Sequence, residues 1–125
     1  MKAISTTLAA AAVGPYSQAA MSENILFISG QLGINPETQE MEDGFEAQAK
    51  RVFKSLEAIL KEAGLGFDNV VKVSVFLQDM NDFAQLNAIY ATHFTEPFPA
   101  REAIEVARLP KDGLVEISLI AVRPS

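Results

Sequence analysis

The fold is decided by the stretch from Asp43 to Leu77, which reads DGFEAQAKRVFKSLEAILKEAGLGFDNVVKVSVFL. From Asp43 to Ala63 the apolar residues recur at helical spacing, so that they share one face. They are Phe45, Val52, Phe53, Leu56, Ile59, Leu60 and Ala63. Acidic residues precede this pattern and Gly64 follows it, as is typical of the two ends of a helix. We therefore predict a long helix with one buried face.

Outside this helix, alternation of apolar and polar residues predicts strands that each bury one face. The clearest are Leu26 to Ile34, Val70 to Leu77 and Leu114 to Val122. Their predicted buried faces are Leu26, Ile28, Leu32 and Ile34, then Val71, Val73, Val75 and Leu77, then Val115, Ile117, Leu119 and Ala121. Further strands are expected from Arg101 to Ala107 and, on a weaker pattern, from Tyr16 to Met21.

A second, shorter helix is expected to begin after Asn81 or Asp82 and to end by Thr95, before Pro97. Its apolar stripe is Phe83, Leu86, Tyr90 and Phe94. The order strand, strand, helix, strand, helix, strand, strand predicts an α+β fold, a two-layer sandwich in which two helices cover one face of a mixed sheet. The length of 125 residues fits a single domain, residues 1–125.

The other face of the predicted sheet is too apolar to be exposed to water and too charged to lie in the hydrophobic core of a single chain. It combines Phe27, Phe76, Leu114 and Ile120 with Lys72, Arg101, Glu105 and Glu116. Burial against further copies of the chain would cover such a face, with the polar groups at the seams. We therefore expect an oligomer.

The composition excludes several classes of function. The net charge is -6, so long-range attraction to nucleic acid or to anionic membranes is not expected. The chain has no cysteine and one histidine, which excludes disulfides, thiolate catalysis and multi-His metal sites within one chain. No apolar run is long enough to cross a bilayer, and we expect a cytoplasmic protein without a membrane partner.

Two charged residues, Arg101 and Glu116, occupy positions in expected strands that suggest a specific role for the charge. Arg101 follows Phe98-Pro99-Ala100 at the start of an expected strand, and its planar guanidinium can grip a carboxylate with two hydrogen bonds. The alternative is a surface or interface salt bridge. Glu116 lies mid-strand among apolar residues, where it can orient or deprotonate a water. The alternative is an ion pair with Arg101, Lys72 or the next subunit.

Four other positions are candidates with weaker signals. Asn87 falls on the apolar stripe of the second helix, where its amide needs a ligand or a nearby backbone carbonyl. Ser29-Gly30-Gln31 puts a glycine inside a strand, which marks a bulge or a close approach by a ligand or another chain. Tyr16 follows a Gly-Pro turn, and packing is its more common role. His93 is expected to be a partly exposed residue near a helix end, with no chemistry assigned.

Seven short motifs are spread over nearly the whole chain. They are Gly14-Pro15-Tyr16-Ser17-Gln18, Ser29-Gly30-Gln31, Asn35-Pro36, Asn87, Phe98-Pro99-Ala100-Arg101, Val106-Ala107-Arg108-Leu109-Pro110 and Val115-Glu116-Ile117. Together they resemble the Rid family of reactive intermediate deaminases, also called the YjgF/YER057c/UK114 family, and its RidA-like subgroup. Each motif is weak alone, and the combination is specific.

The resemblance implies a chorismate-mutase-like (bacillus-type) homotrimer with three sites at subunit interfaces. It also implies hydrolysis of 2-imino acids, such as 2-iminopropanoate and 2-iminobutanoate, to 2-oxo acids and ammonia, with no metal or organic cofactor. These unstable species arise when pyridoxal-phosphate dehydratases release enamines. The protein would therefore protect other enzymes from damage.

The same resemblance implies roles for individual residues. Arg101 would bind the substrate carboxylate and Glu116 would position the attacking water. Tyr16, Ser29, Gly30 and Asn87 would line the same pocket. Many deaminase members have a cysteine where this chain has Ala103, whose backbone can still face the water but which excludes thiol chemistry.

Two other functions compete with the deaminase. One is a non-catalytic trimer that binds small carboxylic acids or stabilises partner proteins in a chaperone-like way, with the same arginine. The other is a ribonuclease or translation inhibitor, a role attached to some relatives. The sequence pI near 4.7 and the absence of a basic cluster disfavour strong RNA binding.

Overall fold

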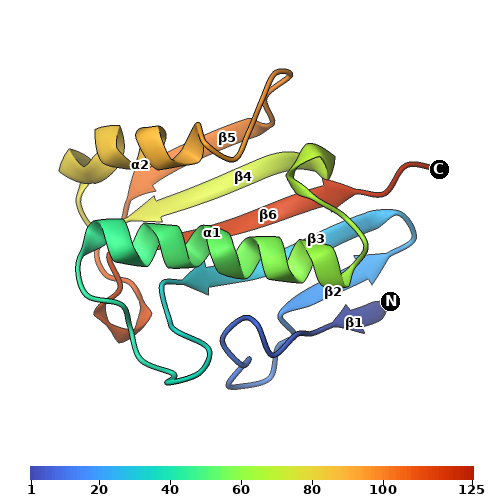
Figure 1. The fold of residues 1–125 in the computed structure, drawn as a ribbon, viewed down its shortest axis with the longest axis horizontal. Coiled ribbons are helices and arrows are strands. Elements are labelled where there is room, and N and C mark those ends of the chain that lie inside the picture. The colour runs from blue at the N-terminus through green and yellow to red at the C-terminus, as the bar shows by residue number, and fades with distance from the viewer.

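The structure, a computed structural model, describes residues 1–125. It contains β1 (Lys2–Ile4), β2 (Ala19–Ser22), β3 (Ile25–Leu32), α1 (Phe45–Glu62), β4 (Val70–Leu77), α2 (Phe83–Tyr90), β5 (Ala100–Glu105) and β6 (Val115–Val122), with short 3-10 helices at Phe67–Asn69, Met80–Asp82 and Pro110–Asp112. Both α-helices lie on one side of the six-stranded sheet (Figure 1). The predicted α+β two-layer sandwich is confirmed.

The sheet is mixed, with the strand order β1-β2-β3-β6-β4-β5. All neighbours are antiparallel except β4 and β5, which run parallel. The chain crosses between that parallel pair through α2, because parallel neighbours cannot be joined by a tight turn. The C-terminal strand β6 fills the middle of the sheet, and β4 separates it from the edge strand β5.

The hydrophobic core lies between α1 and the sheet. The predicted apolar stripe of α1 is buried, with Val52, Phe53, Leu56, Ile59 and Leu60 all fully covered. Opposite it, β6 buries Val115, Ile117, Leu119 and Ala121, as its alternation predicts. Gly44 and Gly64 flank the helix at φ values of 88° and 77°, a region that L side chains rarely adopt. Both ends of α1 are therefore set by backbone turns.

Two β-bulges change the predicted faces of β3 and β4. On β4, Val70 pairs with Ala121 and Lys72 pairs with Ile120, so Val71 has no partner on β6. Val71 is 47% exposed, whereas Val70 is buried. The prediction that Val71 is buried is therefore wrong. A bulge inserts one residue and shifts the alternation before it by one position.

The bulge on β3 lies at the predicted glycine. Ile28 pairs with Leu119 and Gln31 with Ile117, so three steps on β3 oppose two on β6. As a result Gln31 turns into the core and Leu32 is only half-buried, the reverse of the prediction for these two residues.

Element ends also differ from the sequence-based boundaries. The second helix is shorter than expected, because α2 ends at Tyr90, although Phe94 beyond it is still buried. β5 ends at Glu105, and β2 begins at Ala19, so Tyr16 precedes that strand. The three-residue strand β1 is not predicted, since it is too short to show a periodicity.

The face of the sheet away from the helices carries a broad apolar surface, as expected. It exposes or half-exposes Ile25, Phe27, Phe76, Ile104, Ile120 and Val122. Arg101 and Glu105 were expected on this face and lie on the opposite one, because their partners in β4 are the buried Val73 and Leu77. Leu114 precedes β6 and packs against the core, which is a further correction.

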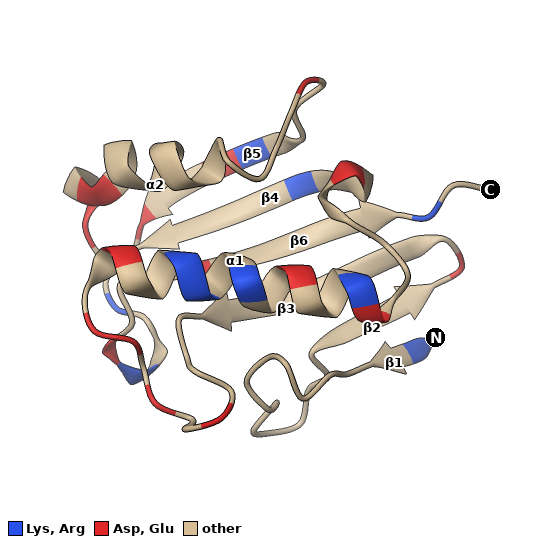
Figure 2. Ribbon diagram, viewed as in Figure 1, with Lys and Arg blue, Asp and Glu red and all other residues tan.

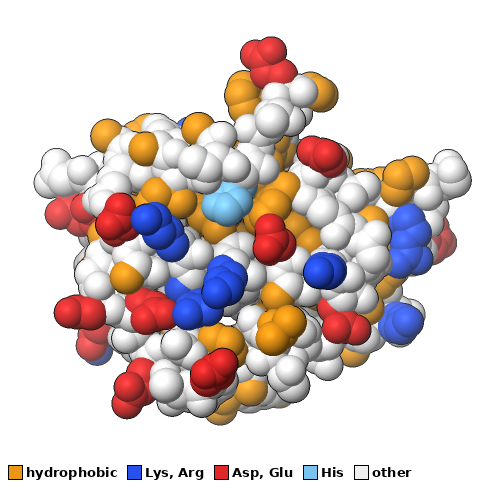
Figure 3. Space-filling model, in the orientation of Figure 1, with side chains coloured by type: hydrophobic (Ala, Val, Ile, Leu, Met, Phe, Trp, Pro, Cys, Tyr) orange, Lys and Arg blue, Asp and Glu red, His pale blue; other side chains and the backbone are white.

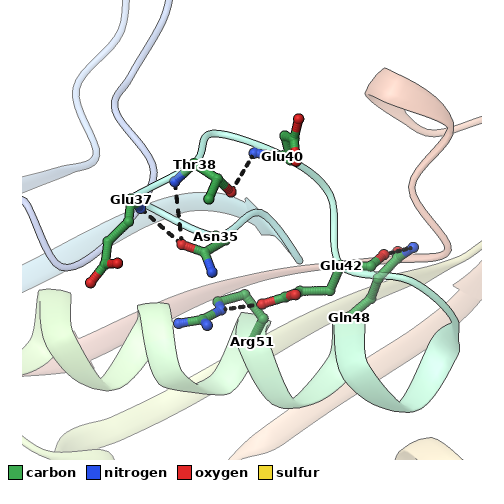
Figure 4. A network of polar contacts seen from close by, with 7 residues as sticks. All are labelled: Asn35, Glu37, Thr38, Glu40, Glu42, Gln48 and Arg51. Carbon is green, nitrogen blue, oxygen red and sulfur yellow. Dashed lines mark hydrogen bonds and ion pairs between the residues drawn. The ribbon is translucent and has the colours of Figure 1, made fainter.

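The loop between β3 and α1 is held by its own polar contacts (Figure 4). The Asn35 side-chain oxygen accepts hydrogen bonds from the backbone N–H groups of Glu37 and Thr38. At the end of the loop, Glu42 pairs with Arg51 at 2.9 Å, and its carbonyl accepts a bond from Gln48. The loop is therefore anchored to α1 and ordered along its length.

Charged residues lie mainly outside the sandwich. Figure 2 shows both acidic and basic residues along α1, and few charged residues on the central strands. One pair, Glu46 and Lys50, is an exposed i,i+4 contact of 3.5 Å, which is worth little to stability. Neither helix has the length and apolar content that crossing a bilayer requires.

Gly33 gives a test of how closely β3 approaches α1. A Cβ at this position would lie 2.5 Å from the Cα of Gln48, so Gly33→Ala forces backbone apart. We expect a loss of stability of about 1–3 kcal/mol, measured by chemical unfolding, because overpacking strains a filled core. Gly66→Ala is the matched control: it meets no atom within 4 Å, and we expect little change. Equal unfolding midpoints for the two variants would contradict the close packing.

Candidate functional site

The candidate site residues divide between the two faces of the sheet. Tyr16, Ser29, Gly30 and Glu116 line one cavity of about 630 Å³. Asn87 and Arg101 lie together on the helix side of the edge strand β5. The two groups are described in turn.

Glu116 is the second residue of β6 and points away from the core. Its neighbours Val115 and Ile117 are fully buried on the helix side, so the alternation sends Glu116 to the open face. Its strand partners are Leu32 on β3 and Phe76 on β4. The carboxylate is therefore flanked by apolar side chains at the floor of the cavity.

Gly30 makes room for this carboxylate. A Cβ on Gly30 would lie 2.7 Å from the carboxyl carbon of Glu116, closer than real Cβ contacts. The bulge, one of the alternatives predicted for Ser29-Gly30-Gln31, is present. The group closest to Gly30 is a side chain of the same chain, which neither alternative named.

The electrostatic setting of Glu116 is unusual for a surface carboxylate. Burial raises the pKa of its carboxyl above the ordinary value of 4.5. None of the four ion pairs of the chain includes it. Lys72, one expected partner, instead pairs with Glu102 at 2.9 Å. Within one chain, Glu116 is a half-buried carboxylate with no cation to stabilise it.

Ser29 connects the cavity to the segment before β2. Its Oγ donates a 2.7 Å hydrogen bond to the carbonyl of Ser17, and its backbone N–H donates to the carbonyl of Gln18. Tyr16, at the start of this segment, is 54% exposed and lies on the cavity wall. Tyr16 therefore contributes surface to the cavity without being packed into the core.

Arg101 is held on the helix side of the sheet by α2. Its Nη1 donates a 2.7 Å hydrogen bond to the side-chain oxygen of Asn87. The guanidinium carbon lies 4.7 Å from the ring centre of Tyr90 and 5.4 Å from that of Phe83, both within cation–π range. Arg101 itself is exposed, so its other N–H groups are free to bind a ligand.

This arrangement gives the side chain of Asn87 a partner within the chain. Its side-chain oxygen accepts from Arg101, a partner that neither alternative named, and its amide nitrogen stays free to donate to a ligand or a carbonyl. The nearby ring of Tyr90 is affected too: burial raises the pKa of its hydroxyl, and the positive charge of Arg101 partly offsets that rise. Two aromatic rings and one amide thus fix the plane of the guanidinium.

Ala103 follows Arg101 by two residues and shares its face. It pairs with Val75 on β4 and packs partly against the core. The side chain that lies beside Arg101 on this face is therefore the methyl group of Ala103.

Arg101 and Glu116 do not meet within one chain. They belong to β5 and β6, two strands separated by β4, and their side chains leave the sheet on opposite faces. The sequence made both residues candidates, and it placed Arg101 on the wrong face. One chain therefore carries two separate groups of candidate residues, which we call half-sites.

His93 lies in a different place from both half-sites. Its ring stacks on that of Phe53, with centroids 4.5 Å apart, in a hollow between α1 and α2 that Figure 3 shows. Burial lowers the pKa of its imidazole, and the nearby carboxylate of Glu57 partly offsets this. No group of three or more His, Cys, Asp or Glu side chains is arranged to hold a metal ion.

The sequence analysis assigned no role to three residues that shape the half-sites. Phe83 and Tyr90 were predicted only as core of the second helix, although both also border Arg101. Gln18 was quoted only as part of a motif, and it is buried beside the cavity. The only sequence signal for Gln18 is that an amide side chain falls inside the strand predicted from Tyr16 to Met21.

The known proteins that match this chain form one family, and they carry different functional names. A family model described as Endoribonuclease L-PSP matches residues 6–123. A RutC family protein of Synechocystis is 53% identical, covering 100% of this chain and 98% of its own. The 2-iminobutanoate/2-iminopropanoate deaminase of mouse is 50% identical, covering 98% of this chain and 91% of its own.

Solved structures agree with these relatives. RidA from an Antarctic Psychrobacter has a TM-score of 0.96 at 49% identity, covering 98% of this chain and 100% of its own. Escherichia coli TdcF with bound serine has a TM-score of 0.94 at 38% identity, covering 99% of this chain and 100% of its own.

The burial of Glu116 predicts a pH-dependent cost to stability. Because the folded chain raises the pKa of this carboxyl, the ionised form is disfavoured on folding. The cost is present above the raised pKa and disappears below the ordinary value near 4.5, where both states are protonated. We expect Glu116→Gln to raise Tm by a few degrees at pH 8, and the gain to vanish towards pH 4. Glu37→Gln, at an exposed loop position, is the control. A gain that grows on acidification would contradict this account.

Proposed function

Because the chain belongs to the Rid (YjgF/YER057c/UK114) family, we propose that it hydrolyses 2-iminobutanoate and 2-iminopropanoate to 2-oxo acids and ammonia. The name that the mouse relative carries supports this reaction. By removing these reactive imines and their enamine precursors, the protein would protect pyridoxal-phosphate enzymes. No catalytic metal or organic cofactor is part of the proposal.

The observation that carries the proposal is the Glu116 carboxylate, which lies unpaired over Gly30 in a cavity of about 630 Å³. A carboxylate with a raised pKa is a better base at neutral pH than an exposed one. A purely structural carboxylate would instead be expected to have an ion pair, and Glu116 has none within the chain.

The chemistry needs few groups, because the carbon of a protonated imine is already electrophilic. Arg101 binds the substrate carboxylate through the N–H groups that Asn87 leaves free. Glu116 orients a water and takes its proton as the oxygen attacks the imine carbon. Glu116 then gives this proton to the nitrogen of the carbinolamine and takes the proton of the new hydroxyl as the C–N bond breaks. The 2-oxo acid and ammonia leave, and the remaining proton is lost to the ammonia as ammonium.

Bringing the two half-sites together requires a second copy of the chain. We propose a homotrimer in which the helix side of β5 of one copy faces the cavity of the next. The apolar residues on the open face, Phe27, Phe76 and Ile120 among them, give such an assembly surface to bury. A head-to-tail interface that closes into a ring would make three equivalent sites.

A non-catalytic function for the same pocket has one observation in its favour. The solved TdcF structure holds serine, a small molecule with a carboxylate. A chain that binds 2-oxo acids without turning imines over would fit that function. Nucleic acid is a poor candidate, since the net charge is -6 and Lys72, the basic residue on the open face, is paired with Glu102.

The first experiment measures release of ammonia and 2-oxobutanoate when a pyridoxal-phosphate dehydratase generates the enamine from threonine. The wild-type chain should accelerate release over the buffer rate. We expect Arg101→Ala and Glu116→Gln each to lower the rate by about ten- to a hundred-fold, because each removes a charged contact. Lys50→Ala, which removes an exposed cation of α1, is the matched control. Full activity in either site variant would remove that residue from the mechanism, and an inactive but folded wild type would favour the binding module.

A mixing experiment tests whether neighbouring copies complete the site. Arg101→Ala and Glu116→Gln are unfolded together in equal amounts and refolded, so that copies assort at random. Where an intact Arg101 meets an intact Glu116, a site is restored, and we expect about one quarter of the wild-type rate. Each variant refolded alone is the control. A mixture no more active than its components would show that the site does not combine these two residues from different copies.

A further inference from the structure

Gln18 is a buried polar residue that the proposed mechanism does not use. It lies directly before β2, is 4% exposed, and lines the cavity that contains Glu116. A buried amide needs partners for both its oxygen and its nitrogen. The hydrogen-bond partners of the Gln18 side chain all lie in the segment that follows β1.

The side chain of Gln18 makes four hydrogen bonds to that segment. Its oxygen accepts a 2.8 Å bond from the backbone N–H of Thr6. Its nitrogen donates to the carbonyls of Thr6 at 3.1 Å, Ala10 at 2.8 Å and Ala9 at 3.4 Å. The amide thus complements both backbone groups of Thr6, as a neighbouring strand would.

The segment from Thr6 to Val13 has little else to hold it. It contains no helix or strand, and its one other hydrogen bond is internal, from the N–H of Leu8 to the hydroxyl of Thr6. Ala9 is buried and gives a small apolar anchor. Every hydrogen bond from this segment to the rest of the chain therefore ends on one side chain.

The far end of this segment forms a wall of the cavity. Ala10, Ala11, Ala12 and Val13 line it on the side of Tyr16, while Glu116 lies on its floor. Three alanines leave room for a small substrate, provided that the backbone behind them stays in place. A loop without such an anchor would sample many positions and would have to be ordered when a ligand binds.

We propose that Gln18 is a positioning residue that sets substrate affinity by fixing the Ala10–Val13 wall of the pocket. The inference rests on the proposed function and deepens it. Gln18 touches neither Arg101 nor Glu116, and its backbone bond to Ser29 does not depend on its side chain. Its loss should therefore weaken substrate binding more than it slows the chemical step.

The test uses two variants of the full chain. Gln18→Met keeps the length of the side chain and removes all four hydrogen bonds. Gln18→Glu keeps the oxygen that accepts from the N–H of Thr6. Its second oxygen replaces the nitrogen that donates to the carbonyls of Thr6 and Ala10, so that acceptor faces acceptor. We expect KM for the imine to rise about tenfold in both, with kcat within about twofold of the wild type. Hydrogen exchange should speed up in parallel at the N–H of Thr6, which donates to Gln18, and at the N–H of Leu8, which donates to Thr6.

The control is Asn69→Ala, which removes another side-chain amide that joins two backbone segments, Gly66 and Val122, outside the cavity. It should lower Tm without moving KM. A Gln18 variant that loses stability but keeps the wild-type KM would overturn the proposal, since its role would then be structural only.

Failure of the proposed function has a different signature. A wild-type chain without imine turnover would contradict the deaminase function. Hydrogen exchange at Thr6 and Leu8, with and without 2-oxobutanoate, would then be the readout. Unchanged exchange in Gln18→Met would then overturn the proposal that Gln18 fixes the Ala10–Val13 wall. Faster exchange that 2-oxobutanoate suppresses less than in the wild type would support it.

Discussion

The structure depends on one constraint: two helices cover one face of the sheet and leave the other bare. α1 packs so closely that the backbone of Gln48 nearly touches Gly33, and the residues of β6 that face the helices, Val115, Ile117, Leu119 and Ala121, are all apolar and buried. A carboxylate on the central strand β6 can therefore exist only on the bare face. There Glu116 still loses part of its hydration, because apolar strand neighbours flank it. The position of the helices thus determines on which face the Glu116 carboxylate lies, and its burial there raises its pKa.

Much of this fold could be predicted because the signals are long and regular. The stripe of α1 runs over five turns, and β6 alternates without interruption, so both buried faces are as expected. The errors fall where one residue breaks the period. Bulges next to Val70 and Gly30 reverse the faces of Val71 and Gln31, and no composition rule marks their exact position. Arg101 was assigned to the wrong face because Ala100–Glu105 has no buried apolar face from which to set the phase.

The candidate site was predictable residue by residue and not as an arrangement. Each of Tyr16, Ser29, Gly30 and Glu116 carried its own local signal, and they share a cavity. Asn87 and Arg101 also carried signals, but their hydrogen bond joins α2 to an edge strand across 14 positions of sequence, which no spacing reveals. Gln18 was missed for a related reason. Its partners lie eight to twelve residues upstream in a segment with no periodicity, so its role is visible only once the chain is folded.

The stacking of His93 on Phe53 has a practical consequence. The chain has one histidine, so its imidazole protons give a single set of magnetic resonance signals that needs no assignment strategy. The Phe53 ring, parallel to it within 12°, shifts those signals through its ring current, an effect that falls steeply with distance. Phe53 belongs to α1, and His93 follows α2, the helix that holds Asn87 against Arg101. A one-dimensional spectrum can thus report the spacing of α1 and α2, and with it the position of the helix that holds Arg101 through Asn87.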